Sequence, residues 1–196
     1  MNTLPRLRPV YHTLAALALI TALGGCGSPA VVVDVATTVA EDRTMGSVLD
    51  DATIKIKLNE QLLRDKFRDL FFKVNTDIYE GDVMLTGDVK TTADRRRAGR
   101  LVKGINGIRR VYNEIQVSGT GGLKETANDV WIETKLRARL TDAKGVKSIN
   151  YRWRAVNRVV YLFGLAQDRD ELDRVKGIVR VTKHVMRIVS HIRLKK

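Results

Sequence analysis

An internal duplication constrains this 196-residue chain more than any other feature of its sequence. Aligned on itself, the chain matches at an offset of 78 residues, which becomes 77 after a one-residue slip. The first matching set is Asp51, Ile54, Lys57, Leu58 and Leu62 against Asp129, Ile132, Lys135, Leu136 and Leu140. The second set is Val83, Leu85 and Gly87 against Val160, Leu162 and Gly164. Because chance matches rarely keep one register over so many apolar positions, the sequence predicts two copies of a module of about 70 residues.

The sequences of the two copies predict the same five elements of secondary structure. Apolar residues at every fourth position of 54–62 and 132–140 predict an amphipathic opening helix. Alternation over 72–78 and 149–155 predicts half-buried strands, and turns at 80–82 and 157–158 join these to strands 83–86 and 159–163. Second helices through 98–105 and 175–182 precede closing strands at 111–117 and 188–194. A strand–helix–strand crossover makes the closing strand parallel to its neighbour, with both helices on one face of the sheet.

The predicted fold class is therefore α+β, with two tandem αββαβ modules, each a three-stranded mixed sheet packed on two helices. We place module 1 at residues 47–118 and module 2 at residues 125–196. Residues 1–25 are predicted to be a signal peptide, and residues 26–46 a modified N-terminus followed by a tether.

The N-terminal segment has the pattern of an export signal. Arg6 and Arg8 precede an uncharged stretch whose apolar part, residues 14–23, would span roughly 15 Å as a helix, about half of a bilayer core. It ends in Leu23-Gly24-Gly25-Cys26, which resembles a bacterial lipobox, and Cys26 is the only cysteine of the chain. The alternative is a generic signal peptide with an incidental cysteine.

The lipobox resemblance implies that the chain is cleaved before Cys26 and that this cysteine becomes a covalent lipid anchor. Several acyl chains make membrane attachment effectively permanent, since each buried methylene contributes about 0.8 kcal/mol. Gly27 follows the cysteine, where lipoproteins retained in the inner membrane often carry aspartate. The resemblance therefore implies an outer-membrane location, with the chain facing the periplasm.

Two motifs resemble those of the BON domain. One is V-x-L-x-G, present as Val83–Gly87 and Val160–Gly164, and the other is the closing strand G-I-x-x-V-x-N-x-I at Gly107–Ile115. The second copy departs from the closing motif, with His184 in place of the glycine and Ser190 in place of the asparagine. These departures concern one loop and leave the predicted fold unchanged.

Two such modules behind a lipobox resemble the dual-BON outer-membrane lipoproteins of the DolP type, and the resemblance covers residues 45–196. It implies a role in maintaining outer-membrane integrity, binding of anionic phospholipid through the second module, and envelope or barrel-assembly proteins as partners. We also expect that the chain is not an enzyme.

The inventory of reactive residues favours the same conclusion. Only His184 and His191 remain after removal of the signal, and no nucleophile elbow, phosphate loop or metal-ligand spacing is present. A run of carboxylates, Asp168 to Asp173, stands at the start of a predicted helix, where acids satisfy unpaired N–H groups and complement the dipole. We therefore predict no catalytic residue, no cofactor and no metal site.

The net charge of +13 is concentrated in module 2. Residues 27–119 hold 15 basic and 14 acidic residues, whereas residues 120–196 hold 18 basic and 8 acidic residues. A basic domain favours anionic partners, either nucleic acid or a membrane surface, and the export signal argues against nucleic acid. An anionic phospholipid surface is therefore the predicted partner.

The opening helix of module 2 carries the predicted lipid site. Trp131 projects about 140° away from the apolar face of this helix, next to basic residues whose stems can reach headgroups. Tryptophan favours membrane interfaces. The predicted phospholipid-binding residues are Trp131, Lys135, Arg137, Ala138, Arg139 and Leu140.

Two questions stay open at this point. Trp131 can instead pack against the other module or a partner protein, which makes the alternative function a protein-binding adaptor that docks an acidic envelope partner. A second basic strand face, formed by Arg152, Arg154 and Arg158, suits lipid, lipopolysaccharide or an acidic protein equally well.

Overall fold

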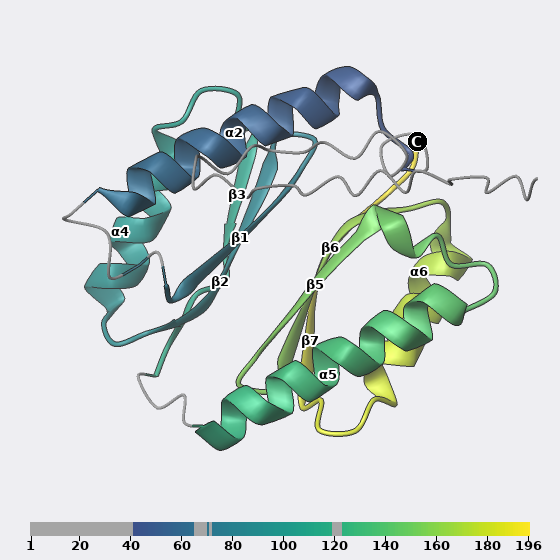
Figure 1. Cartoon of the computed structure of the whole chain (residues 1–196). Coiled ribbons are helices and arrows are strands. Elements are labelled where there is room, and N and C mark those ends of the chain that lie inside the picture. The colour runs from purple at the N-terminus through teal and green to yellow at the C-terminus, as the bar shows by residue number, and fades with distance from the viewer. Residues whose placement is uncertain (1–40, 65–69, 71, 119–122) are drawn as a thin grey trace, which may run out of the picture. The chain divides into compact units, whose positions relative to one another are not determined.

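The computed structural model describes residues 41–64, 70, 72–118 and 123–196 (Figure 1). Both modules belong to one compact unit of the chain. Within the described ranges, no helix is long and apolar enough to cross a membrane. Cys26 and the predicted signal peptide lie outside the described residues.

Module 1 and module 2 have the same order of elements. The elements of module 1 are α2 (Met45–Leu63), β1 (Val74–Tyr79), β2 (Asp82–Val89), α4 (Thr92–Lys103), β3 (Arg110–Asn113) and β4 (Gln116–Val117). The elements of module 2 are α5 (Leu123–Asp142), the short 3-10 helix η2 (Ser148–Asn150), β5 (Tyr151–Val156), β6 (Val159–Ala166), α6 (Arg169–Arg180) and β7 (Arg187–Leu194).

The predicted mixed sheets are confirmed. In each module the hairpin is antiparallel, and the closing strand pairs in parallel with the second hairpin strand. In module 1 this closing strand is divided into β3 and β4, because the Ile115 N–H bonds to the side chain of Asn113 at 3.4 Å. Ser190 replaces this asparagine in module 2, where β7 is continuous. The first strand was predicted to begin too early in both modules. Phe72 lies in a turn before β1 and is 77% exposed, and the equivalent Ile149 lies in η2 before β5.

A conserved feature of the two copies is the carboxylate that holds each hairpin turn. Residues 80–81 and 157–158 all have positive φ angles, as expected for a type I′ turn. The Asp51 carboxylate on α2 accepts the N–H groups of residues 80 and 81, both at 2.7 Å. Asp129 on α5 accepts the corresponding pair in module 2 at the same distances. Each opening helix is thereby tied to its hairpin.

The glycine that ends each V-x-L-x-G motif is required by close backbone packing. Gly87 and Gly164 have φ angles of 132° and 127°, and a Cβ at either position would lie 2.0 Å from a carbonyl oxygen of the neighbouring strand segment, that of Lys73 or Asn150. Any side chain would therefore push the hairpin strands apart.

Each sheet is buried on both faces. The helix-facing cores gather around Leu58 in module 1 and Leu136 in module 2. A third cluster lies between the two sheets and contains Tyr79, Met84, Val156, Tyr161, Phe163 and Leu165. The order of layers is therefore helices, sheet, sheet, helices, with α2 and α5 in opposite outer layers (Figure 1).

Candidate functional site

The predicted lipid-binding residues all lie on α5, but they do not share one surface. Leu140 is completely buried in the core of module 2, so its prediction as a lipid contact was wrong. It continues the apolar face that packs on the sheet. The side chains of Lys135, Arg137, Ala138 and Arg139 are exposed.

Trp131 is half-buried and packs on the flank of its own module, so the prediction that it points away from its own core was wrong. The connection between α6 and β7 passes beside the indole, and the His184 ring meets it edge-on with a centroid distance of 5.2 Å. Lys135 places its ammonium 5.8 Å from the indole centroid, in cation–π geometry. His184 stands at a φ of 70°, where module 1 has Gly107 at 97°.

The connection between α6 and β7 adds exposed apolar and basic residues to this flank. Val181 is 72% exposed and Met186 is 70% exposed. Arg139 reaches the connection from α5 and donates to the Thr182 hydroxyl at 3.2 Å. The combined set, called here the basic–apolar surface, is Trp131, Lys135, Ala138, Arg139, Arg180, Val181, Lys183, Met186 and Arg187.

Arg158 holds the connection in place. Its side chain donates to the His184 carbonyl at 2.9 Å, and its own carbonyl accepts the N–H of Met186 at 2.9 Å. Arg158 is therefore a positioning residue for the basic–apolar surface.

Sequence reasoning missed Val181 and Met186. The available signal was the presence of apolar residues between the basic residues of 180–187, together with the duplication itself. Module 1 has Gly104 and Arg109 at the equivalent positions, so the two apolar side chains are particular to module 2.

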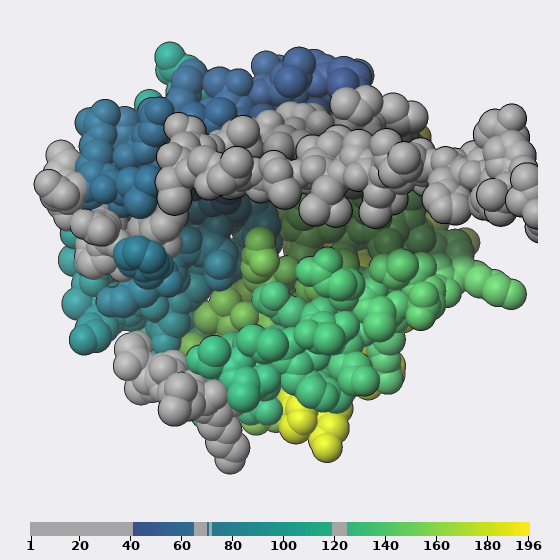
Figure 2. All heavy atoms as spheres, viewed as in Figure 1, coloured from purple at the N-terminus to yellow at the C-terminus, as the bar shows by residue number. Residues whose placement is uncertain are grey.

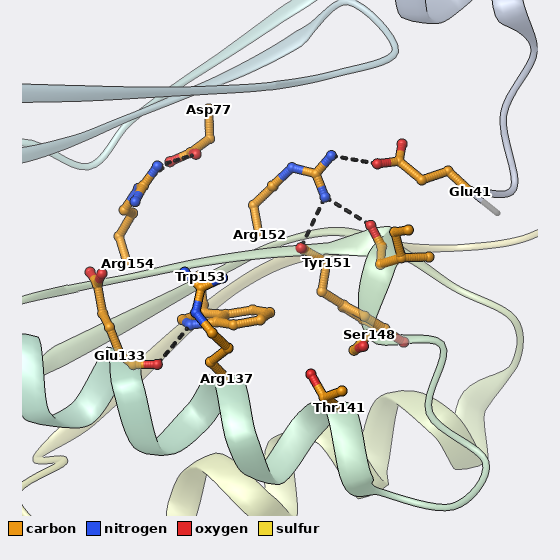
Figure 3. A pocket seen from close by; sticks show the side chains of 11 residues that line it. Glu41, Asp77, Glu133, Arg137, Thr141, Ser148, Tyr151, Arg152, Trp153 and Arg154 are labelled. Carbon is orange, nitrogen blue, oxygen red and sulfur yellow. Dashed lines mark hydrogen bonds and ion pairs between the residues drawn. The ribbon is translucent and has the colours of Figure 1, made fainter. Parts of the chain in front are cut away.

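Arg137 projects from the other flank of α5 into a groove of about 430 Å³ between α5 and module 1 (Figures 2 and 3). In Figure 2 this groove is the hollow between the blue atoms of module 1 and the green atoms of α5. The other lining residues are Glu41, Asp77, Glu133, Thr141, Ser148, Ile149, Tyr151, Arg152, Trp153 and Arg154. Since acidic and basic side chains alternate on its walls, the groove does not select an anion.

The basic strand face of module 2 finds its acidic partners within the chain. Arg154 forms a bidentate pair with Asp77 of β1, with both N–O distances at 2.8 Å (Figure 3). Arg152 pairs with Glu41 at 2.8 Å and donates to two backbone carbonyls of module 2. Arg154 therefore joins the two modules, and Arg152 binds the segment that precedes α2.

Equivalent positions of the two modules carry opposite charges at this contact. Asp77 and Arg154 correspond to each other in the duplication, and so do Lys55 and Glu133 on the opening helices. Burial lowers the pKa of Lys55 and raises the pKa of Glu133, and each of these groups interacts with the charges of Asp77 and Arg154. A pair of identical modules would bring like charges together, so the inversion favours contact between module 1 and module 2.

The residues that directly precede α2 are bound by both modules. Arg43 pairs with Asp51 of module 1 at 2.6 Å. Asp42 accepts from Lys147 and Lys195 of module 2 at 2.8 and 2.9 Å, and from Asn150 at 2.8 Å. The hydrogen bond from Lys147, followed by those from Asn150 and Lys195, holds the pKa of Asp42 well below its ordinary value.

The carboxylate run at the start of α6 has the structural role that its position predicts. Asp168 caps the helix by accepting the Glu171 N–H at 2.7 Å. Glu171 is 2% exposed and accepts the backbone N–H groups of Lys147 and Gln167, both at 2.6 Å. His191 pairs with Glu114 of module 1 at 2.9 Å.

The fold and its surface define a tandem α+β repeat protein with one basic–apolar surface, on module 2. The chain belongs to the BON-domain family, because the BON domain model matches residues 50–119 and 128–196. It is a dual-BON protein of the DolP type.

Three relatives illustrate the breadth of this similarity. A protein of Anaplasma centrale, "Uncharacterized protein in gshII 5'region", is 38% identical over 75% of this chain and 96% of its own length. The outer membrane lipoprotein DolP of Haemophilus influenzae is 28% identical over 91% of this chain and 98% of its own length. Osmotically-inducible protein Y of Escherichia coli is 26% identical over 77% of this chain and 76% of its own length.

Proposed function

We propose that the chain is a non-enzymatic, lipid-anchored outer-membrane protein that binds anionic phospholipid through the basic–apolar surface of module 2. The observation that carries the proposal is that exposed Val181 and Met186 belong to the α6–β7 connection, whose His184 contacts Trp131 of α5 and which also carries basic side chains. Apolar side chains can enter the interfacial region of a bilayer while the surrounding cations contact phosphates.

Five cations belong to this surface, namely Lys135, Arg139, Arg180, Lys183 and Arg187. Each basic residue near an anionic membrane contributes about 1 kcal/mol, and this contribution falls with salt. Reversing one such charge removes an attraction and adds a repulsion, so we expect a loss of about 2 kcal/mol, or roughly 30-fold in affinity.

The test is co-sedimentation of the chain from residue 27 with vesicles of phosphatidylcholine alone or of phosphatidylcholine mixed with the anionic lipid phosphatidylglycerol. We expect binding that requires the anionic lipid and weakens as salt rises. Met186→Asp should reduce binding without a folding cost, because this side chain is mostly exposed. Trp131→Ala should also reduce binding, but it removes packing from the flank of module 2.

The duplication supplies a matched control. Lys135→Glu and Lys57→Glu make the same change at equivalent positions of α5 and α2, and both lysines are exposed. We expect only Lys135→Glu to lose binding. Equal losses for both variants, or full binding by Met186→Asp, would refute the proposed surface.

Attachment to the outer membrane is the second part of the proposal. It is supported by the lipobox that ends at Cys26 and by the similarity to an outer membrane lipoprotein that covers nearly the whole chain. Palmitate labelling that is lost in Cys26→Ala, together with co-fractionation of the natural chain with outer membranes, is the expected result. Loss of membrane integrity is measured by sensitivity to detergent in cells that lack the chain.

The alternative function, an adaptor that docks an acidic envelope protein, loses part of its basis in the structure. Arg152 and Arg154 are already paired with carboxylates of the chain itself. Salt-sensitive binding of an acidic protein, without binding to vesicles, would favour the adaptor.

A further inference from the structure

The opening helix of module 1 carries an exposed apolar stripe on the face opposite its own core. Four of its residues are 44–54% exposed, namely Met45, Leu49, Ile56 and Leu63. With Ala52 they follow spacings of 4, 3, 4 and 7 residues, so the stripe occupies an arc of about 60° on the helix surface. This is the heptad spacing of a helix that packs against another helix, with Asn59 at the interrupted position.

The C-terminal half of the stripe is particular to module 1, because α5 has the apolar residues Leu123, Ala127 and Val130 at the positions of Met45, Leu49 and Ala52. At the equivalent positions, α5 has Thr134, Arg137 and Thr141 in place of Ile56, Asn59 and Leu63. The buried faces of both helices stay apolar, with residues such as Leu58 and Leu136 completely buried. The C-terminal half of the outer face is therefore apolar in α2 and polar in α5, although both helices support the same fold.

Charges beside the stripe favour a protein helix over an anionic membrane. The exposed flank of α2 carries Asp50, Lys57 and Glu60, and Arg64 follows directly after the last residue of the helix. These four charges alternate in sign and sum to zero. A flank of zero net charge gains little from an anionic bilayer. A helix with the opposite alternation can pair with each of these charges while its apolar face covers the stripe.

The order of layers also separates this stripe from the basic–apolar surface. Since α2 and α5 lie in opposite outer layers, a bilayer bound along α5 leaves α2 facing away from it (Figure 1). Two copies that paired face to face through α2 would point their α5 helices in opposite directions, so they would not bind the same membrane surface.

We propose that the α2 stripe docks an amphipathic helix of another envelope protein, with apolar residues at alternating spacings of three and four. This inference goes beyond phospholipid binding. It rests on that proposed function only where the opposite outer layers of α2 and α5 exclude the pairing of two copies on one membrane. Four half-exposed aliphatic side chains amount to a patch of a few hundred Å² (~300–600), below the roughly 800 Å² per partner of a stable interface. The contact is therefore a transient one.

The test is site-specific photo-cross-linking in cells that make the full chain. Benzoylphenylalanine replaces Ile56 on the stripe or, as the matched control, Thr134 at the equivalent position of α5. We expect an adduct from position 56 whose cross-linked peptide, sequenced by mass spectrometry, belongs to an amphipathic helix of another protein. Leu49→Asp with Leu63→Asp in the same chain should reduce this adduct at least tenfold.

Four results would overturn the proposal: no adduct from position 56, an adduct with phospholipid only, an adduct with a second copy of the chain only, or an adduct that the two aspartates leave unchanged. Thermal unfolding monitors the fold of the aspartate variant, whose altered side chains are half-exposed. Its vesicle binding should stay unchanged, so failure of this proposal and failure of the lipid proposal are separate outcomes.

Discussion

The ion pair between Asp77 and Arg154 is predicted to couple the folding of the two modules. Its two N–O distances are 2.8 Å, and the side chains are 6% and 35% exposed, respectively. Two unit charges about 4 Å apart at an effective dielectric constant of 20 attract by about 4 kcal/mol, which desolvation partly offsets. Loss of one partner is expensive chiefly because it leaves the other charge buried.

The two single substitutions therefore have unequal expected effects. Arg154→Gln leaves a buried carboxylate without its bidentate partner and should lower the free energy of unfolding by about 3 kcal/mol. Asp77→Asn leaves a guanidinium that is partly exposed and can turn to solvent, so about 2 kcal/mol is expected. The combined variant should cost about 3 kcal/mol, which gives a coupling of about 2 kcal/mol in the double-mutant cycle.

A charge exchange gives a sharper test of the surrounding charges. Asp77→Arg with Arg154→Asp preserves the pair, but it places an arginine near Lys55 and an aspartate near Glu133. The exchanged chain should therefore be less stable than the neutral combination of Asn and Gln. If the ion pair were independent of Lys55 and Glu133, the exchanged chain would instead be more stable than the neutral combination.

The assay is urea unfolding of the chain from residue 27, followed by circular dichroism and by tryptophan fluorescence. Both tryptophans, Trp131 and Trp153, belong to module 2, whereas circular dichroism reports both modules. The two transitions should coincide in the natural chain and separate in Arg154→Gln. A coupling below about 0.5 kcal/mol, with coincident transitions in every variant, would refute the reasoning.

Three further substitutions test the local structure. Gly164→Ala should cost at least about 2 kcal/mol in thermal unfolding, because its Cβ would meet the Asn150 carbonyl at 2.0 Å; an unchanged melting temperature would contradict this. Asp129→Asn should cost about 1–3 kcal/mol by weakening the hold on the hairpin turn, with faster amide exchange in that turn as the second readout. Asp42→Asn should destabilise the chain at pH 7. Its pKa is lowered by Lys147 in the fold, so its contribution is complete above the ordinary pKa of 3.8 and is lost progressively as pH falls from there toward the lowered pKa of the folded state; a difference in melting temperature that is as large at pH 2 as at pH 7 would contradict the assignment.

The fold of each module was predicted well because the residues that determine it form local patterns, which occur in both copies. The turn residues, the glycine after each second strand and the apolar faces of the helices all act within one module. Phe72 was wrongly placed in a strand because alternation of apolar and polar residues continues past the point where hydrogen bonding to β2 ends.

The candidate site was harder to predict. An angle on a helical wheel places Trp131 away from the core, but it carries no information on the α6–β7 connection that covers one side of the indole. The prediction of Leu140 as a lipid contact was wrong, because its spacing from Leu136 places it on the buried face of α5. Exposed Val181 and Met186 were missed because apolar residues in a short connection are ordinarily expected to be buried.

Spacing and composition are enough to predict a duplicated α+β module, its family and the concentration of positive charge in module 2. Tertiary contacts determine which of these basic side chains are paired within the chain and which stay exposed. Packing of one sheet on the other pairs Arg154 with Asp77, a residue 77 positions away in the sequence. This part of the basic face is therefore neutralised by a carboxylate of the same chain. The same packing places α2 and α5 in opposite outer layers. Which charges remain for a partner depends on contacts between segments distant in the sequence, and periodicity along one helix or strand does not contain them.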